Sequence, residues 1–555
     1  MQTAMEGLFN SSHLVRLTIA SCMVALALWR LLARRRYLEN VPGPQGSHPL
    51  LGHLPLRLRS QAAQIDFDWV NQYGNIVKFD GAFGERRLLI TDPKALHHIM
   101  QTSGYTYIRS EDRKEPMRTL LGKGVLVVEG ECMGDDHRRQ RKILMPSFNS
   151  VEANGYVPSF ASKAAQMAEE WIDMMPNDGG MVVDIPSWVA RATLDALGEA
   201  ALDYQFDALD DPTHNKLVSV YTNLLAKIRF APTDLEVLAL EALALIPRPL
   251  KRWWNDHVPN KRRAYMKRCR EVAEGVAREL VQRQRPAVSA GEGSTRRDVL
   301  SRLVAANAAA DPKTRLGEDE VYAQLLTILL AGHETTANSL SWALLELAQA
   351  PSIQDRLRAE ILASRSARST AFLTADDIHA MPFLNAVVQE VLRFHTSVID
   401  TARTATRDDV IPLSRPLLDR KGRPVYEVAV RKGQHILVSI AAYQRNKDLY
   451  GPDADRFNPE RWLKEGYVSQ KAGGGIYSNL LTFGGGHRAC PGWRFAVLEL
   501  SAFLVELVGR FEFSVSPDVV ARVYRGAAGV MIPMLEGELE KGVQLPLHVK
   551  PALVE

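Results

Sequence analysis

Cysteine is scarce in this chain, which has four cysteines among 555 residues. They are Cys22, Cys132, Cys269 and Cys490, and no two of them lie close together in the sequence. This wide spacing excludes a disulfide framework and the paired-cysteine pattern of a zinc site. The bulk of the chain therefore suits a reducing, cytosolic setting.

Basic and acidic residues are nearly balanced in number. The formal net charge is +4 at pH 7, which is too small to indicate a nucleic-acid partner. The sequence contains no internal repeat and no glycine-rich fingerprint for a flavin or nicotinamide nucleotide. Although the length exceeds the usual size of one domain, nothing indicates a second catalytic domain.

Apolar runs long enough to cross a bilayer are rare, and the candidate lies near the N-terminus. Residues 14–33 are mostly apolar and about 20 residues long, enough for a spanning helix. Arg34, Arg35 and Arg36 follow at once, which predicts a cytosolic location for the rest of the chain. The alternative is a cleaved signal peptide, but arginines stand where a small-residue cleavage site is needed. We predict a membrane anchor over 1–37, a Pro/Gly hinge over 38–46 and one catalytic domain over 47–555.

The rest of the chain has a mostly helical pattern. Apolar residues recur at helical spacing over 161–175, 261–285, 318–349 and 382–394, and a long apolar segment covers 493–511. Two β-hairpins are predicted, one over 75–90 around Gly81 and Gly84, the other over 425–440 turning at Lys432 and Gly433. Segments 286–297 and 470–475 read as loops. The predicted fold class is mainly α with a small β region.

One apolar segment allows two interpretations. Residues 235–246 are strongly apolar, and Pro247, Pro249, Trp253 and Trp254 follow them. Such a segment either dips into a membrane surface, where Trp is favoured, or forms a buried core helix. The sequence supports both alternatives equally.

Cys490 is placed to present its sulfur to a ligand. It lies in FGGGHRACPG at 483–492, where the glycines allow a tight turn and close approach of a flat group. Amides at the start of the next helix favour a negative sulfur, and a thiolate suits an axial haem ligand. The pattern of Phe483, Gly486, Arg488 and Cys490 resembles the haem-binding signature of the cytochrome P-450 (haem-thiolate monooxygenase) family. The alternative is a buried free cysteine in a Gly-rich turn, which the length of the pattern disfavours.

The middle of segment 318–349 carries a second resemblance. Ala331 and Thr335 lie four residues apart and share a helix face, where a small Ala lets a cofactor approach. The Thr335 hydroxyl can bond back to a carbonyl one turn earlier, which opens the helix slightly. Glu334 and Thr335 resemble the acid–alcohol pair that delivers protons in the family's oxygen-activating helix. An ordinary Thr-Thr step beside a solvated Glu is the alternative.

The resemblance assigns three charged residues a structural role. Glu390 and Arg393 lie three apart on one helix face, and Arg461 lies in FNPERW at 457–462. By resemblance, Glu390, Arg393 and Arg461 form a buried charge cluster behind the haem. The alternative is an exposed pair of Glu390 and Arg393, which would contribute little stability.

The resemblance also implies a set of cations for the haem propionates. The family pattern of Trp, three residues and Arg is met here by His137 and Arg141, so a His replaces the Trp. Arg403, ten residues after Arg393, and Arg488 complete the set. Three neighbouring basic residues either dock an acidic electron donor or form a solvated face: Arg138, Arg139 and Lys142.

Substrate contacts are implied by the family's pocket positions. The segment after Arg393 reads FHTS at 394–397 and departs from the family's usual Pro pair. The implied pocket residues are Leu330 and Ala331 on the helix and Ser397, Val398, Ile399 and Thr401 after Arg393, with Val125 and Leu126 as weaker candidates.

Taken together, the motifs imply a membrane-anchored haem-thiolate monooxygenase, with a cytochrome P-450 fold after one transmembrane helix. The resemblance implies haem b as the cofactor and electrons from NADPH through an NADPH–haemoprotein reductase. It also implies O2 and a lipophilic small molecule as substrates. The basic segment 137–142 and the chain length resemble fungal microsomal members. This predicts the endoplasmic reticulum membrane, and a terpenoid or other secondary metabolite as substrate.

Two other haem-thiolate functions remain open. One is an isomerase or dehydratase that rearranges a peroxide without a reductase. Such an enzyme needs no proton-delivery pair, so the presence of Glu334 and Thr335 counts against it. A haem-binding sensor needs a second strong axial ligand. His333 is the nearby candidate, and it is offset from the face of Ala331 and Thr335.

Overall fold

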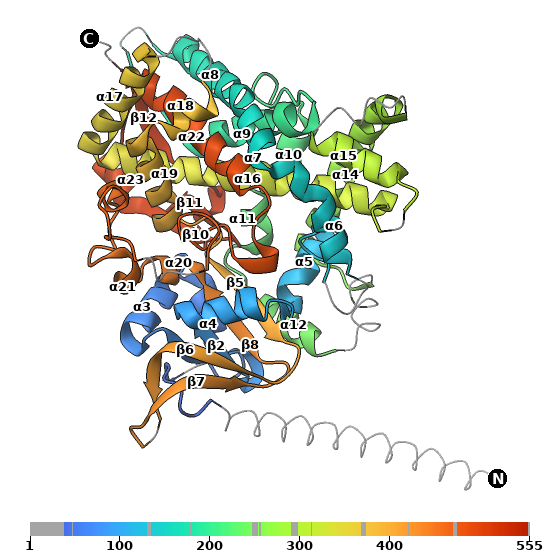
Figure 1. The fold of residues 1–555 in the computed structure, drawn as a ribbon, viewed down its shortest axis with the longest axis vertical. Helices are drawn as coiled ribbons and strands as arrows, with labels where there is room; N and C mark the ends of the chain where they lie inside the picture. Colours follow the sequence, from blue (N-terminus) through green and yellow to red (C-terminus); the bar gives the residue numbers. More distant parts are fainter. Residues whose placement is uncertain are drawn as a thin grey trace, which may run out of the picture.

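The chain folds into a helical body with a strand-rich region at one end (Figure 1). A computed structural model describes residues 38–552 except for 47, 130–134, 177–178, 247–253, 255–256, 290–297, 312, 368–372, 420 and 470–473. The predicted anchor over 1–37 lies outside the described residues. Within the described part, no helix is both long enough and apolar enough to cross a membrane.

Helices make up most of the described chain. The longer ones are α3 (Gln64–Tyr73), α5 (Glu111–Leu121), α6 (Asp136–Leu144), α8 (Val157–Met174), α9 (Ile185–Leu202), α12 (Asp234–Leu245), α14 (Lys261–Ser289), α15 (Val299–Ala308), α16 (Glu318–Gln349), α17 (Pro351–Ala367), α19 (Pro382–Phe394) and α22 (Trp493–Arg510). The shorter ones are α2 (Leu54–Arg59), α4 (Pro93–His97), α7 (Ser150–Gly155), α10 (Lys216–Tyr221), α11 (Leu224–Arg229), α18 (Ala375–His379), α20 (Ile440–Gln444), α21 (Lys447–Tyr450) and α23 (Pro517–Arg522).

The strands form four small sheets. The largest has five strands in the order β1 (Ile76–Asp80), β2 (Arg86–Ile90), β8 (His435–Ser439), β5 (Asp400–Ala405) and β3 (Tyr107–Arg109). β6 (Asp409–Leu418) pairs with β7 (Pro424–Val430), and β10 (Val523–Ala527) pairs with β11 (Met531–Leu535). β4 (Met181–Asp184), β12 (Pro546–Pro551) and β9 (Phe511–Ser514) form the fourth sheet. The predicted class, mainly α with small β regions, is confirmed.

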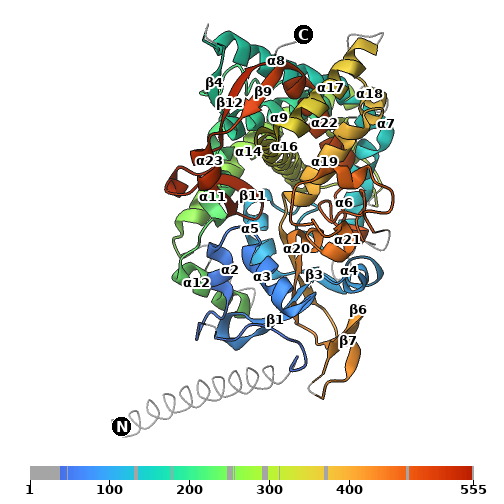
Figure 2. The same cartoon turned by 90° about the vertical axis from the view of Figure 1, so that its left-hand side faces the viewer.

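Helix α16 runs through the middle of the helical body (Figure 2). It begins with Glu318, Asp319 and Glu320, whose negative charges suit the positive end of the helix dipole. The Glu320 carboxylate also accepts a hydrogen bond from the backbone N–H of Gly317, at 2.9 Å. Most of the helix is buried against α9, α14, α19 and α22, so its few exposed positions are informative.

One of the two predicted hairpins is wrong. β1 and β2 pair antiparallel, as expected for segment 75–90. β7 and β8, predicted as partners, belong to different sheets: β7 pairs with β6, whereas β8 lies between β2 and β5. Gly433, with φ +86°, makes the predicted turn, and its N–H donates to the Ala405 carbonyl of β5. The turn residues were correctly identified, but a turn does not determine which strand the chain joins next.

The C-terminal end of helix α14 also differs from the prediction. Helix α14 continues to Ser289, with Pro286 inside it, whereas a loop was predicted from 286. Proline removes one amide donor and disfavours the helical conformation only at the residue before it. Residues 290–297, the rest of the segment predicted as a loop, lie outside the described residues.

Candidate functional site

Cys490 lies between a short 3-10 turn, Gly486–Arg488, and the start of α22. Its backbone N–H donates to the Phe483 carbonyl at 2.7 Å, which closes the loop. The Phe483 ring is buried and packs edge-on against Tyr477. The loop that holds the cysteine is therefore fixed by its own backbone and by one buried ring.

The glycines of this loop are required by the chain itself. Gly486 has φ +62°, and a Cβ built on it would lie 2.0 Å from the Met100 carbonyl oxygen. A Cβ on Gly485 would lie 2.1 Å from the Gly474 carbonyl oxygen. The sequence suggested that these glycines admit a flat ligand. In the structure they admit two neighbouring backbone segments, which side chains would displace.

The surroundings of Cys490 act on its thiol in opposite directions. Burial raises the pKa of the Cys490 thiol, whereas a backbone hydrogen bond from Gly492 and the positive charge of Arg141 lower it. A metal ion removes the proton of a coordinating thiol outright. The loop thus offers a sulfur that Gly492 and Arg141 favour as a thiolate once an iron atom is bound.

Several cations converge near the Cys490 loop. Arg109 on β3 and Arg403 on β5 are direct cross-strand partners, and Arg488 lies close enough to lower the pKa of both. Like charges placed opposite each other in a sheet are destabilising unless an anion lies between them. The nearby carboxylate is Glu129, which pairs with Arg488 and lies 3.4 Å from Lys114.

Burial lowers the pKa of the basic groups in this cluster. Burial, followed by repulsion from Arg109 and Arg488, lowers the pKa of Arg403 to about 9. Burial, Arg488 and Arg141 lower the pKa of His137 to about 3, so this imidazole is neutral. The Nε atoms of Arg109 and Arg488 are buried and have no hydrogen-bond acceptor among the described residues. Such a group of unsatisfied donors fits two carboxylates of a buried ligand.

Arg109 was not found from the sequence. It stands in a three-residue strand with no motif around it, and only the pairing of β3 with β5 brings it beside Arg403. Of the predicted cations, Arg141 is half-buried near Cys490, and its pKa is lowered by burial. The Arg403 side chain also donates to the Thr401 hydroxyl at 2.8 Å.

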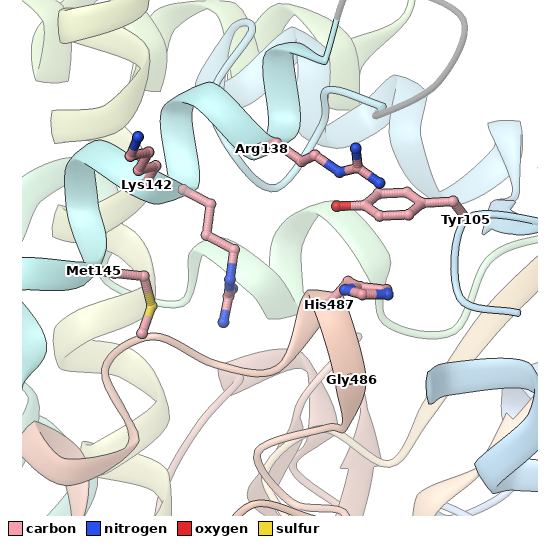
Figure 3. Close-up of a pocket in the computed structure, with 7 residues that line it drawn as sticks. Tyr105, Arg138, Lys142, Met145, Gly486 and His487 are labelled. Carbon is pink, nitrogen blue, oxygen red and sulfur yellow. The ribbon is translucent and has the colours of Figure 1, made fainter. Parts of the chain in front are cut away.

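The outer side of α6 borders an open cavity of about 410 Å³. Figure 3 shows Arg138 and Lys142 at its upper edge, with Tyr105 beside Arg138 and His487 below them. Arg138 and Lys142 are exposed, but Arg139 is not part of this face. Arg139 turns to α16 and pairs with Glu320 at 2.5 Å. The basic face therefore has two of the three members considered from the sequence.

The Ala331–Thr335 face of α16 is less buried than the rest of this core helix. Ala331 is exposed and Thr335 half-buried, although Leu330 and Thr336 beside them are buried in the core. The Thr335 hydroxyl donates to the Ala331 carbonyl at 2.8 Å, as the sequence suggested. The helix nevertheless continues without a break from Glu318 to Gln349. A small residue and a hydroxyl thus lie partly unburied in the middle of a helix that is otherwise packed in the core.

Glu334 and His333 follow each other on α16 and differ in their hydrogen bonds. Burial raises the pKa of Glu334 to about 8, so the carboxyl group is mostly protonated at neutral pH. Its Oε2 atom has no hydrogen-bond partner in the part of the chain that the structure describes. The His333 ring stacks on Tyr221 of α10, and its Nδ1 atom lies 2.5 Å from the Leu329 carbonyl oxygen. His333 is therefore held away from the Ala331–Thr335 face.

Glu390, Arg393 and Arg461 form one buried group. Arg393 donates twice to the Glu390 carboxylate, at 2.7 and 2.8 Å, and Arg461 Nε lies 3.0 Å from both of its oxygens. All three side chains have no exposed surface. Trp462 Nε1 and the Asn458 N–H also donate to Glu390. The alternative of an exposed pair is wrong, since a fully buried network fixes the loops after α19.

The segment after α19 contacts α16 at Thr335. The Ser397 hydroxyl lies 2.8 Å from the Ser339 hydroxyl and donates to the Thr335 carbonyl at 3.1 Å. Ile399 is buried and Val398 is half-buried. The pocket roles of these residues remain predictions. The contact from Ser397 to α16 was not predicted, because it depends on the hydroxyl that replaces the family's proline.

Comparison with known proteins decides the family. A model of the family described as cytochrome P450 matches residues 41–540. The chain belongs to the cytochrome P450 family. Cytochrome P450 monooxygenase 205 of Postia placenta is 32% identical, over 97% of this chain and 98% of its own length. Cytochrome P450 monooxygenase claO of Ampulloclitocybe clavipes is 31% identical, over 94% of each chain. This P450 is thus an oxidoreductase of the monooxygenase type.

Membership of the family implies a haem cofactor, O2, a substrate and a redox partner that supplies electrons. The residues present fit a haem. Cys490 can ligate the iron, and Arg109, Arg403 and Arg488 offer buried donors to the propionates. Ala331 is exposed in the middle of the core helix α16. A bound haem would explain both the unsatisfied donors of the arginines and the exposed alanine in the middle of α16.

Proposed function

We propose that this P450 inserts one oxygen atom from O2 into a lipophilic small molecule, a terpenoid or another secondary metabolite. Its electrons come from NADPH through an NADPH–haemoprotein reductase. The observation that carries the proposal is the partly unburied Ala331–Thr335 face of the core helix α16, where a protonated Glu334 stands next to the Thr335 hydroxyl in the chain. Oxygen activation needs protons at a buried site, and these two groups can supply them.

Different residues of the chain have different roles in the proposed reaction. When bound, the haem supplies the iron at which O2 is reduced and the oxygen atom is transferred. Cys490 would ligate the iron through its sulfur, which the loop closed by Phe483 keeps in place. Arg109, Arg403 and Arg488 would hold the carboxylates of the group. Glu334 carries a proton and Thr335 presents a hydroxyl, while the buried side chains of α16 exclude bulk water.

The two rival functions are less favoured by the same residues. An isomerase needs neither a proton-carrying acid nor a reductase, and Glu334 would then be a costly buried group without a task. A six-coordinate sensor needs a second axial ligand, and His333 is stacked on Tyr221 instead. Dependence of turnover on NADPH and reductase separates the first rival, and carbon monoxide binding separates the second.

A membrane location is part of the proposal. Helix α12 buries Val237, but Leu235 is 75% exposed and Leu240 48% exposed. The alternative of a buried core helix is therefore wrong for α12. Exposed leucines on one helix suit the surface of a bilayer. With the anchor predicted over 1–37, they support attachment to the cytosolic side of the endoplasmic reticulum.

The reductase is proposed to dock on the side of α6. Arg138 and Lys142 are exposed there and border the cavity beside Gly486 and His487 (Figure 3). Arg138 lies over the Tyr105 ring, 4.8 Å from its centre. A basic rim attracts an acidic partner and shortens the path to the Cys490 loop.

The decisive experiment is the carbon monoxide difference spectrum of the reduced protein. It compares the unaltered chain with Cys490→Ala and with Cys269→Ala, a control at the buried free cysteine of α14. We expect a thiolate-type Soret band in the unaltered chain and in Cys269→Ala, and none in Cys490→Ala. A folded, haem-loaded chain without this band, or a band that survives Cys490→Ala, would refute the proposed function.

A further inference from the structure

One face of α16 lies against the segment that follows α19. Four residues of α16 are spaced four, three and four positions apart, which is the spacing of a single helix face: Thr335, Ser339, Trp342 and Glu346. The first two contact Ser397, and the last two contact His395. The short segment 395–397 therefore follows α16 over about three turns of the helix.

His395 attaches the start of this segment to α16. Its ring stacks on the Trp342 ring, with the ring centres 4.6 Å apart and the ring planes at 5° to each other. Its Nε2 atom lies 2.6 Å from a carboxylate oxygen of Glu346. His395 and Trp342 are buried, so bulk water does not compete for these contacts. The stack and the hydrogen bond together determine the orientation of the imidazole ring.

Ser397 attaches the other end of the segment through its hydroxyl. This oxygen lies 2.8 Å from the Ser339 hydroxyl, and both hydroxyls reach the Thr335 carbonyl, at 3.1 and 3.0 Å. Two hydroxyls bring two protons, so one hydroxyl can bond the carbonyl while the other joins the two side chains. Ser339 is 4% exposed and Ser397 is 5% exposed, so bulk water does not replace a lost partner. Removal of the Ser397 hydroxyl therefore breaks the direct link from this residue to α16.

The backbone of Ser397 is held from a second side by β11. The Met531 N–H donates to the Ser397 carbonyl at 2.8 Å. The Met531 carbonyl in turn accepts a hydrogen bond from the Trp342 Nε1 atom at 3.2 Å. Ser397, Met531 and α16 thus form a closed ring of contacts, which fixes the Ser397 hydroxyl relative to the helix.

The carbonyl that Ser397 contacts belongs to the residue proposed to take part in proton delivery. The side-chain hydroxyl of Thr335 donates one turn back, to the Ala331 carbonyl. The hydroxyl and the carbonyl of Thr335 are joined through one Cα atom, so a movement of the backbone also moves the hydroxyl. A displacement of about 1 Å in a reacting group can lower a rate about 100-fold. Hydrogen bonds to the backbone of such a residue therefore affect the reaction as well as the fold.

We propose that Ser397 is a positioning residue: its hydroxyl, together with that of Ser339, fixes α16 at Thr335 and so determines where the Thr335 hydroxyl stands. This inference rests on the proposed monooxygenase function and adds a residue to its machinery. A proline, which the family usually has in this segment, has no hydroxyl to make the bond. Because the predicted pocket residues Val398 and Ile399 follow directly, a substrate that contacts them acts on α16 through Ser397.

The test is the infrared C–O stretching band of carbon monoxide bound to the reduced, full-length, haem-loaded chain. The frequency of this band responds to polar groups close to the bound gas, because their fields act on the C–O dipole. Thr335→Ala defines the shift that loss of the hydroxyl causes. In Ser397→Ala we expect the band to shift in the same direction, since the Thr335 hydroxyl is no longer held in place. Ser397→Thr keeps a hydroxyl and should restore the band of the unaltered chain.

Ser341→Ala is the matched control on the same helix. Ser341 is also buried, but its hydroxyl donates to the Ala337 carbonyl, at 2.8 Å, and this variant should keep the unaltered band. The inference is overturned by an unchanged band in Thr335→Ala or Ser397→Ala, by an equal shift in Ser341→Ala, or by a shift that persists in Ser397→Thr. A Ser397→Ala chain that no longer holds haem would show a purely structural role and would overturn it as well. The Soret band of the same samples reports separately on the proposed function.

Discussion

Single residues carry the chemistry of this P450, and Glu390 carries much of its stability. Its carboxylate accepts hydrogen bonds from Arg393 and Arg461, and none of the three side chains has exposed surface. In Glu390→Gln the two arginines lose their shared counter-charge, so we expect a loss of about 3–5 kcal/mol in the free energy of unfolding. Denaturant unfolding monitored by circular dichroism measures it.

A surface glutamate gives the matched control for this prediction. Glu460 pairs with Arg356, and the two side chains are 40% and 50% exposed. Glu460→Gln should change the unfolding free energy by less than about 1 kcal/mol. Equal effects of the two substitutions would mean that the buried network does not stabilise the chain as its hydrogen bonds indicate.

We expect Glu334 to make the coupling of electron use to product formation depend on pH. Burial raises the pKa of Glu334 to about 8, so it holds a proton below this pH and loses it above. We therefore expect product formed per NADPH to fall as the pH rises through about 8. Glu334→Gln should have low coupling at every pH. A profile that is unchanged in Glu334→Gln would remove this residue from proton delivery.

The raised pKa of Glu334 also makes the stability of the folded chain decrease as the pH rises. In the unfolded chain the carboxyl ionises near its ordinary pKa of 4.5, whereas in the folded chain it stays neutral up to about 8. The stability that this group confers is therefore complete below the lower value and is lost progressively up to the higher one. Glu334→Gln stays neutral, so its melting temperature relative to the unaltered chain should rise across this range.

Thr335 is expected to govern how oxygen is used. Its hydroxyl donates to the Ala331 carbonyl, and its side chain is half-buried in the middle of α16. Thr335→Ala removes the hydroxyl, so we expect NADPH oxidation to continue while peroxide replaces product, with coupling reduced about tenfold. Thr335→Ser keeps the hydroxyl and is the control. Normal product yield in Thr335→Ala would exclude Thr335 from the proton path.

At the scale of elements, local patterns predicted local structure well. The bounds of α16 and α19 match the apolar spacing of 318–349 and 382–394, because capping residues and periodicity are properties of neighbouring residues. The pairing of β8 was missed. It joins β2 in parallel and β5 antiparallel, and both partners are distant in the sequence. Strand partners are selected by tertiary packing, which no short pattern records.

The candidate site shows the same division. Cys490, Glu334 and Thr335 could be proposed from the sequence because each stands in a motif with a defined spacing. Arg109 could not, since only the pairing of β3 with β5 brings it beside Arg403. The Ser397 contact with Thr335 was missed because it depends on how the segment after α19 packs on α16. Sequence motifs thus propose reacting groups, and their roles stay predictions, whereas neighbours that come together only in the fold escape them.

At the scale of the whole molecule, two separate regions are expected to hold this P450 on a membrane. Removal of residues 1–37 should leave a chain that still sediments with liposomes, because α12 keeps its exposed leucines. Adding Leu235→Glu and Leu240→Glu to the shortened chain should release it, about tenfold in partition coefficient. Replacing the exposed Val520 of α23 by Glu is the control. Release by the truncation alone would exclude a membrane role for α12.

The facing arginines of β3 and β5 have a consequence for the life of the protein in the cell. Arg109 and Arg403 repel each other across two strands, and Arg488 adds a third charge. A ligand that neutralises them binds the folded chain and not the unfolded one, so it shifts the folding equilibrium by mass action. The amount of this P450 that escapes proteolysis should then follow the supply of haem at the time of synthesis. Regulation of porphyrin production would act as regulation of enzyme abundance, without any change in transcription.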